Sequence, residues 1–416
     1  MEKRTSIGRR LKLFAAGVIA LVGVSHLLRR RKRHGQSPEA VHQADLYATP
    51  ESDAFVSPIR LEIDAMERMF LYNFEGDDEY NGLELQLFDH PSKGQGAAAL
   101  MWRTDETVDF YMTPGLRLDR DKVEVGAGVG EWITQDFDYR CEITPRGLDC
   151  AVALTLKDGR PVRLVVRENR RRPGKALNIL APMGTGIRAP RFFPFFWLIG
   201  IDLVRVSGTE ARLQIGETTY PPIRLPVPMP HSGAFAYFVR CCADPLLVLV
   251  NRAYAGPLRA VTPDTATGFA HEGMTYDLTL RDGHYEIARA SVRNAAHEAS
   301  IRFAPPLPDL LDLKDGAATR GRFALGVDAV TDIVRGAYEV QRAGQEVRVR
   351  LYPTENWKPR GTIRQRLTLW FFPPVFRTWP KTYEWSAKLD LSGADGSVMM
   401  SSGWRRTGPD APTEAD

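Results

Sequence analysis

Two clusters of aromatic residues are the part of this sequence best suited to hold an apolar molecule. They occupy residues 192–199 and 369–376, and Trp379 follows the second closely. Each run contains proline, which is disfavoured in a central strand, so we expect the rings at loops or sheet edges. Large apolar patches in such places usually mark a ligand, membrane or partner surface. The predicted ligand-binding residues are Phe195, Phe196, Trp197, Trp370, Phe371 and Trp379.

The same clusters have a second interpretation, in which they pack as bulky core edges between two sheets. Aromatic side chains dominate ordinary protein cores, so core packing alone would explain their number. The neighbouring cations Arg191 and Arg377 favour the first interpretation, because cations beside aromatic rings suit the bilayer interface. Both interpretations stay open.

The residues that could do acid–base, nucleophilic or metal chemistry form no motif. The histidines beyond residue 34 have no H-x-H or H-x-x-x-H spacing, so no local metal site is predicted. Neighbouring pairs such as Asp89 and His90 point to opposite faces of a strand and make no dyad. No G-x-S-x-G nucleophile motif is present. The sequence therefore predicts no metal and no cofactor, and it does not favour an enzyme.

Two further segments have a simple structural interpretation. The acidic residues 75–79 could offer oxygen ligands to Ca²⁺ but lack the spacing of an EF-hand loop, so a solvated turn is favoured. The glycine-rich residues 126–130 precede an extended pattern, so no helix N-terminus is available there to hold a phosphate.

The four cysteines indicate strand geometry. A two-residue turn at Pro145 and Arg146 places Cys141 directly opposite Cys150, where a disulfide is possible. Reduced, half-buried thiols are an equally good interpretation, because a cytosolic compartment would keep them reduced. Cys241 and Cys242 are adjacent, so on a strand they face opposite ways.

Short alternating runs broken by Gly, Pro and Asp indicate strands through most of the chain. The pairs Asp158-Gly159 and Asp282-Gly283 predict tight hairpins, and the six residues ending at each pair are closely similar. One helix is predicted at 57–71, because Ser57 suits an N-cap and Ile59, Ile63, Met66 and Phe70 fall on one helical face. Residues 244–250 fit a helix or a buried strand equally well.

The amino terminus predicts attachment to a membrane. Residues 13–28 carry no charge and are flanked by basic residues on both sides. This apolar run is close to the shortest that spans a bilayer, so a cleaved export signal and an interfacial helix remain alternatives. We expect a membrane-anchored protein, of the kind found at a bacterial inner membrane. Nearly equal charge on the two flanks leaves the side of the membrane undecided.

The charge of the remaining chain argues against nucleic-acid binding. Residues 1–34 carry ten basic residues and one acid, a net charge of +9, so the rest sums to −5 of the formal total of +4. A mildly acidic body is a poor match for a phosphate backbone.

These patterns predict a mainly β protein with two antiparallel barrel-like or sandwich units and an N-terminal anchor helix. The expected parts are an anchor or signal at 1–33, a linker at 34–56, a first β unit with a leading helix at 57–255, a second β unit at 256–404 and a loose tail at 405–416. The outline resembles that of double-lipocalin-like hydratases and cyclases, a similarity of architecture without a shared motif.

The predicted function is that of a membrane-tethered protein that binds an apolar or lipid-like ligand between its aromatic clusters. One alternative is a lipocalin-like enzyme that acts on an isoprenoid or lipid by acid catalysis, using a carboxyl group whose pKa an apolar barrel raises. Another is an assembly protein whose clusters meet a partner chain.

Overall fold

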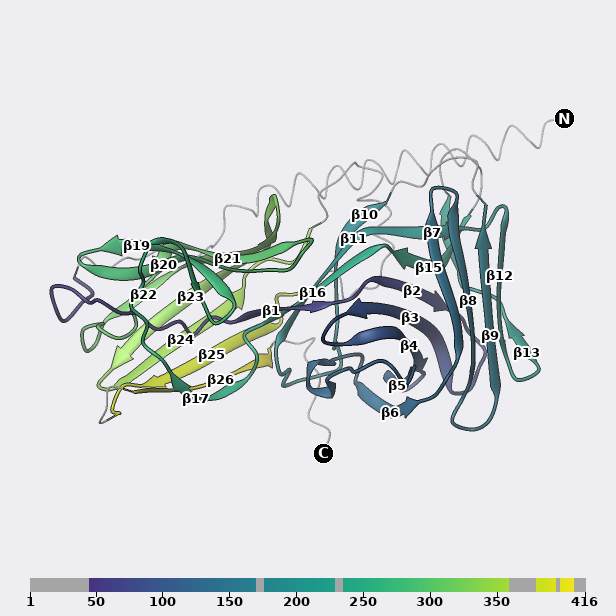
Figure 1. Cartoon of the computed structure of the whole chain (residues 1–416), viewed down its shortest axis with the longest axis horizontal. Coiled ribbons are helices and arrows are strands. Elements are labelled where there is room, and N and C mark those ends of the chain that lie inside the picture. The colour runs from purple at the N-terminus through teal and green to yellow at the C-terminus, as the bar shows by residue number, and fades with distance from the viewer. Residues whose placement is uncertain (1–44, 170–175, 229–234, 359–378, 394–396, 408–416) are drawn as a thin grey trace, which may run out of the picture.

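A computed structural model describes residues 45–169, 176–228, 235–358, 379–393 and 397–407. Strands make up 63% and helix 1% of this structure, which confirms the mainly β class. The helical part is the 3-10 turn η1 (Arg120–Lys122). Figure 1 shows two bodies side by side, with a ten-stranded sheet in the green and yellow body and two further sheets in the purple and teal body. The predicted anchor at 1–33 lies outside the described residues.

The largest sheet has the order β1-β16-β11-β15-β2-β3-β4-β5-β6, with β10 paired to β11 and β14 paired to β15. Its strands are β1 (Leu61–Ala65), β2 (Arg68–Asn73), β3 (Tyr80–His90), β4 (Gly94–Arg103), β5 (Thr107–Met112), β6 (Gly128–Thr134), β10 (Leu177–Ala181), β11 (Phe193–Arg205), β14 (Arg224–Pro228), β15 (Phe235–Cys242) and β16 (Asp244–Val250). All pairs are antiparallel except β5 with β6. The part from β2 to β6 curls into a half-barrel (Figure 1).

A five-stranded sheet packs against this half-barrel and has the order β13-β12-β9-β8-β7. Its strands are β7 (Asp138–Thr144), β8 (Gly147–Thr155), β9 (Pro161–Glu168), β12 (Thr209–Ile215) and β13 (Thr218–Tyr220). Alternating side chains such as Val152, Leu164 and Val166 are buried against Tyr72 and Leu85, as expected for strands with one face in the core.

The ten-stranded sheet forms the second body as an antiparallel meander in which each strand from β18 to β26 pairs with the next. Its strands are β17 (Tyr254–Leu258), β18 (Thr267–His271), β19 (Met274–Arg281), β20 (His284–Arg293), β21 (Glu298–Leu307), β22 (Ala318–Val327), β23 (Val330–Ala343), β24 (Glu346–Pro353), β25 (Tyr383–Asp390) and β26 (Val398–Arg406). The last strand pairs with β17, so β17 and β18 are the two edges. We call the gap between these edges the seam.

The predicted helix at 57–71 is wrong, because residues 61–65 form β1 and residues 68–71 belong to β2. Strand β1 pairs with β16, with Leu61 opposite Val250. Ile59, Leu61 and Ile63 alternate with period two, so the spacing that suggested a helical face fits a strand as well. Residues 244–250 form the strand β16, which is the buried-strand alternative for this segment. Because β16 pairs with residues 61–65, these residues form a strand and not a helix.

The described part of the predicted linker, residues 45–56, is packed along the second body, and we call it the strap. Leu46, Tyr47, Phe55 and Val56 are buried in the same core cluster as the ten-stranded sheet. Phe55 exchanges two backbone hydrogen bonds of 3.0 Å with Val261, and Ser52 N donates to Gly283 O at 3.0 Å. The strap therefore ties the start of the chain to the second body before β1 enters the first.

The predicted hairpins are confirmed. Asp158-Gly159 lies in the loop of residues 156–160 that joins β8 to β9, with positive φ at Gly159 and not at Asp158. Asp282-Gly283 is a two-residue turn between β19 and β20, with φ of 49° and 77°. Positive φ at both central residues defines the turn that matches strand twist, which explains the Asp-Gly pair. Cys241 lies in the core of the first body and Cys242 in the core shared with the second, so they face opposite ways as predicted.

Candidate ligand-binding site

A cavity of about 380 Å³ lies at the seam, between β17, β18 and the chain segment that leads into β1. Its apolar wall comes from the segment that leads into β1 and from β1, β17 and β19, while β18 contributes His271. The buried residues of that wall include Phe55, Ile59, Leu61, Leu258, Met274 and Tyr276. A volume of this size falls within the range of small-molecule sites.

Backbone contacts hold the walls of the cavity in place. Arg60 N donates to Asn251 Oδ1 at 2.9 Å, and Asn251 N returns a 2.8 Å bond to Arg60 O. Asn251 has φ of 49°, a left-handed conformation that asparagine adopts more readily than most residues. Leu61 N lies 3.4 Å from Met274 Sδ, which joins β1 to the edge of the second body. These contacts bring together segments about 200 residues apart in sequence.

Charged side chains form the rim of the cavity: Arg60, Arg252, Arg259, Glu62, Glu272 and His271. Arg60 Nη2 lies 3.1 Å from Glu272 Oε2, and its guanidinium stands 5.0 Å from the centre of the Tyr254 ring. Arg252 Nη1 lies 3.8 Å from Glu62 Oε2. The Arg60 and Glu272 side chains are 42% and 46% exposed, so solvent screens their attraction and the pair is worth about 1 kcal/mol or less.

The charged side chains at the rim carry a net positive charge. Arg259 is exposed and makes no ion pair with the described residues, while Glu62 also contacts Lys122. Three arginines face two carboxylates in the lining. An apolar wall below a positive rim can hold the tail and the anionic group of one amphiphilic molecule.

The residues predicted to bind ligand lie elsewhere. Phe195, Phe196, Trp197 and Trp379 are between 1% and 6% exposed in the core between β11 and the second body, and none lines the cavity. Trp197 packs edge-on to Trp357, with ring centres 6.4 Å apart. This is the core-packing interpretation of the clusters. Trp370 and Phe371 lie outside the described residues.

The proline argument against a central strand needs correction, because Pro194 lies within β11. Among the described strands, β16 pairs with β11 at Pro194, while β10 pairs with it only from Phe196 onward. Proline is tolerated there because the side without a partner strand needs no hydrogen-bond donor.

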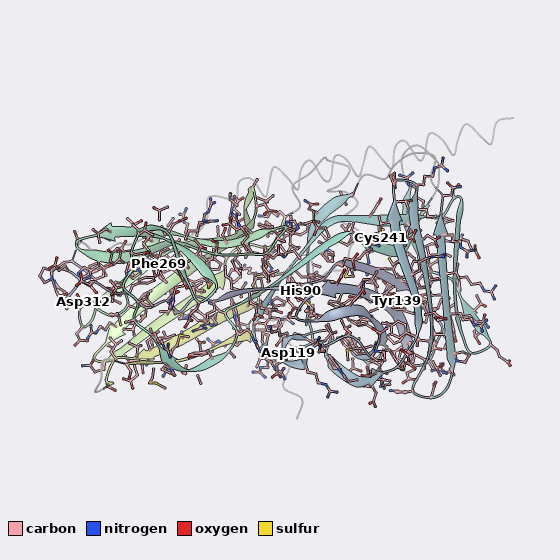
Figure 2. All side chains as sticks on the ribbon, in the orientation of Figure 1. His90, Asp119, Tyr139, Cys241, Phe269 and Asp312 are labelled. Carbon is pink, nitrogen blue, oxygen red and sulfur yellow. The ribbon has the colours of Figure 1, made fainter. Side chains whose placement is uncertain are left out.

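A buried polar cluster lies where the strap crosses β20. The Tyr47 ring stacks on His284 at 3.9 Å, and its hydroxyl donates to Glu286 Oε1 at 2.6 Å. His284 Nδ1 lies 3.5 Å from Asp309 Oδ2, and His284 Nε2 lies 3.1 Å from the Thr49 carbonyl oxygen. Burial raises the pKa of Asp309 to about 6 and also raises the pKa of Glu286. Figure 2 places the neighbouring Asp312 at the far end of the second body, on the same body as Phe269.

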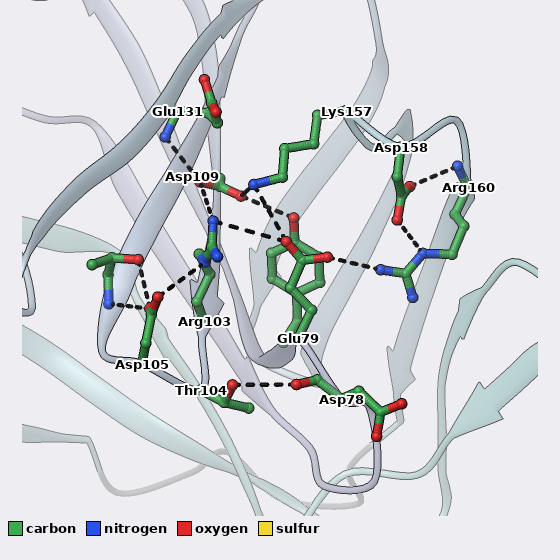
Figure 3. Close-up of polar contacts among 12 residues, drawn as sticks. Asp78, Glu79, Arg103, Thr104, Asp105, Asp109, Glu131, Lys157, Asp158 and Arg160 are labelled. Carbon is green, nitrogen blue, oxygen red and sulfur yellow. Dashed lines mark hydrogen bonds and ion pairs between the residues drawn. The ribbon is translucent and has the colours of Figure 1, made fainter.

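A second polar network joins the start of β3 and strand β5 to the β8–β9 hairpin (Figure 3). Asp109 has no exposed surface, and its carboxylate accepts from Tyr80 Oη at 2.9 Å, from Glu131 N at 2.9 Å and from Lys157 Nζ at 3.1 Å. Burial and the bond to Asp109 raise the pKa of Tyr80. Each carboxylate oxygen of Asp109 already has a partner, so this network stabilises the fold and offers no open position to a ligand.

The acidic segment 75–79 belongs to the same network. Asp77 accepts from Tyr220 Oη and from Arg160 at 3.0 Å each, and Glu79 contacts Arg160 at 3.2 Å. These carboxylates pair with cations of the β8–β9 hairpin, so the expected solvated turn is a partly buried one. Among the described residues no group of three or more His, Cys, Asp or Glu could hold a metal ion.

The two cysteines of the predicted pair lie directly opposite each other on β7 and β8. Both are buried free thiols in this structure. Thr144 and Gly147 flank the two-residue turn as a hydrogen-bonded pair, so counting along the ladder makes Cys141 and Cys150 a non-hydrogen-bonded pair. Side chains approach most closely at such positions.

The chain matches no family model, no curated protein and no solved structure. Within the part of the chain that the structure describes, no helix has the length and apolar character needed to cross a bilayer. The choice of function therefore rests on the geometry of the site.

The cavity was not predicted from the sequence. Its rim residues are single charges in unrelated segments, and none stands in a motif. The nearest local signal is Glu272-Gly273, which follows the pattern of a hairpin turn. That signal locates the tip of the β18–β19 hairpin but says nothing about the cavity beside it.

Proposed function

We propose that this protein binds a small amphiphilic molecule in the cavity at the seam. The observation that carries the proposal is the combination of a cavity of about 380 Å³, a buried apolar wall and a rim with three arginines. The predicted class of ligand, apolar or lipid-like, is kept, while the proposed site moves from the aromatic clusters to the seam. A membrane tether at 1–33 would hold this site near molecules that partition into a bilayer.

The size of the cavity limits the ligand. At roughly 30 Å³ for each group the size of a water molecule, the cavity holds about 12 non-hydrogen atoms. A medium-length chain with one polar group fits this volume.

The proposal is tested by filling the cavity. Ala253 is exposed and lines the cavity, so Ala253→Trp places an indole in it without disturbing the core. Ala255→Trp is the matched control, because Ala255 is exposed on β17 and does not line the cavity. Native mass spectrometry on protein purified from its own host should show a bound small molecule in the parent and in Ala255→Trp. Equal retention by Ala253→Trp would exclude the seam as the site.

A second candidate function, acid catalysis, is favoured by Asp309. Its carboxyl group has a pKa of about 6 and lies beside His284, so it holds a proton at mildly acidic pH in an apolar body. Both side chains are covered by the strap, so a substrate such as an isoprenoid would reach them only if the strap moved. Turnover with a pH profile that falls above pH 6 and disappears in Asp309→Asn would support this function over simple binding.

A further inference from the structure

One of the two carboxylates at the rim of the cavity, that of Glu272, pairs with a rim arginine. Glu272 lies at the tip of the β18–β19 hairpin, where His271 pairs with Met274 across a two-residue turn. Its carboxylate lies 3.1 Å from the Arg60 guanidinium at the edge of the cavity. The Arg60 guanidinium also stands beside the Tyr254 ring, so it contacts both this ring and the Glu272 carboxylate.

The backbone at Glu272 is unusual for this residue type. Glu272 has φ of 48° and Gly273 has φ of 78°, which defines a turn that favours Asn, Asp or Gly at its first position. Two other hairpins of the same sheet carry aspartate at the equivalent position, Asp282 with φ of 49° and Asp328 with φ of 49°. Glutamate is a poorer choice for the turn, but its longer side chain extends further toward Arg60. The presence of glutamate at position 272 is therefore explained by its contact with Arg60 and not by the needs of the turn.

The contact is of a kind that exchanges easily. Both partners are more than 40% exposed, so replacing one carboxylate by another costs little. Arg252 has only a 3.8 Å contact with Glu62, and Arg259 makes no ion pair with the described residues, so an incoming anion gains further cations nearby.

We infer that the ligand is an anionic amphiphile whose head group displaces Glu272 from Arg60, so that Glu272 acts as an internal competitor for the head-group site. This inference rests on the proposed function and adds the class of head group, a carboxylate or phosphate monoester. For a carboxylate of about 12 non-hydrogen atoms, the tail is that of a medium-chain fatty acid such as decanoate.

The test compares two ligands of equal size on the full-length protein by isothermal titration calorimetry. Decanoate carries the charge, and decanamide is its neutral counterpart. In Glu272→Gln, decanoate should bind about fivefold more tightly than in the parent, because the competing charge is gone. In Arg60→Gln, decanoate should bind at least about tenfold more weakly. The affinity for decanamide should stay the same in both variants. Decyl phosphate in place of decanoate distinguishes the two head groups.

Two further variants keep the result interpretable. Asp282→Asn removes the same kind of charge from the same kind of turn away from the cavity, so it should not change decanoate binding. Glu272→Asn removes the charge with a residue that suits positive φ, so a failure of Glu272→Gln to fold would not hide the effect.

The outcomes separate the two proposals. If decanoate and decanamide bind the parent equally and Glu272→Gln changes neither affinity, the cavity binds amphiphiles but the competitor role is overturned. If neither ligand nor decyl phosphate binds the parent or Glu272→Gln, the proposed function itself is overturned.

Discussion

Asp109 shows how much one buried charge can depend on its neighbours. Its side chain is completely buried, and it is held by Tyr80, Glu131 and Lys157 in the network of Figure 3. Removing one member of a buried ion pair costs more than the pair contributes, because the remaining charge keeps its desolvation penalty without its partner. Side chains of this kind should therefore control the stability of the first body.

Asp109→Asn should lower the free energy of unfolding by roughly 2 kcal/mol, because Tyr80 and Lys157 lose their charged acceptor, although Lys157 keeps its 3.3 Å contact with Glu79. Urea unfolding measures this loss. Asp105→Asn is the control: the Asp105 side chain is 55% exposed, and its substitution should cost much less than that of Asp109. Equal losses in the two variants would contradict a special role for burial.

Asp309 predicts a dependence of stability on pH. Burial raises its folded-state pKa from 3.8 to about 6, so the folded protein binds this proton more tightly than the unfolded chain. The resulting stabilisation is fully present below pH 3.8 and is lost as the pH rises through 6. Between pH 3 and 7 the parent should lose about 3 kcal/mol relative to Asp309→Asn, which carries no such proton. A difference in the free energy of unfolding between the parent and Asp309→Asn that stays constant with pH would contradict the raised pKa of Asp309.

At the scale of strands and hairpins, the residues of a short turn were sufficient to predict how its two flanking strands pair. The β7–β8 and β19–β20 hairpins have the two-residue turns that the sequence predicts, because such a turn fixes the register of its own flanking strands. The β8–β9 hairpin instead has a longer loop, residues 156–160. The two similar Asp-Gly segments belong to sheets with different strand orders and to loops of different length, so they do not mark one position in a repeated unit.

The β7–β8 hairpin offers a direct test of its register. Mild oxidation should join Cys141 to Cys150, because non-hydrogen-bonded partners bring their side chains closest. The cross-link closes a short loop and should raise the free energy of unfolding by roughly 2 kcal/mol. Mass spectrometry of a non-reduced digest identifies the linked peptides. A link from Cys150 to Cys241, whose side chain lies in the same core, would show that the core opens before oxidation.

The two bodies are joined by more than a linker. The core that contains Phe193, Trp379 and Trp404 continues from β11 and β16 into the ten-stranded sheet. Trp404 Nε1 also donates to the carbonyl oxygens of Val250 and Asn251, at 3.0 and 2.9 Å. Because the strap adds a second connection, we expect the bodies to unfold together, and the cavity lies where they meet.

The tether is tested by removing it. The full-length chain should sediment with membranes, and a variant that lacks residues 1–33 should stay in the supernatant, because the apolar run and its basic flanks are the predicted anchor. The shortened variant should still bind decanoate, since the cavity is formed by residues beyond 54. Membrane retention without residues 1–33 would place the attachment in the β bodies.

The sequence by itself determined the mainly β class, the tight hairpins and the opposite directions of Cys241 and Cys242. Each of these follows from residues close together in the chain, where turn type and side-chain alternation leave few alternatives. Only the tertiary structure decided that 61–65 is a strand, that the strap is packed and that the described aromatic rings lie in the core. It also formed the cavity, because Arg60 and Glu272 meet only after β1 has paired with β16 and the strap has crossed the second body. Contacts of such long sequence separation are set by which surfaces bury each other, and no local pattern specifies them.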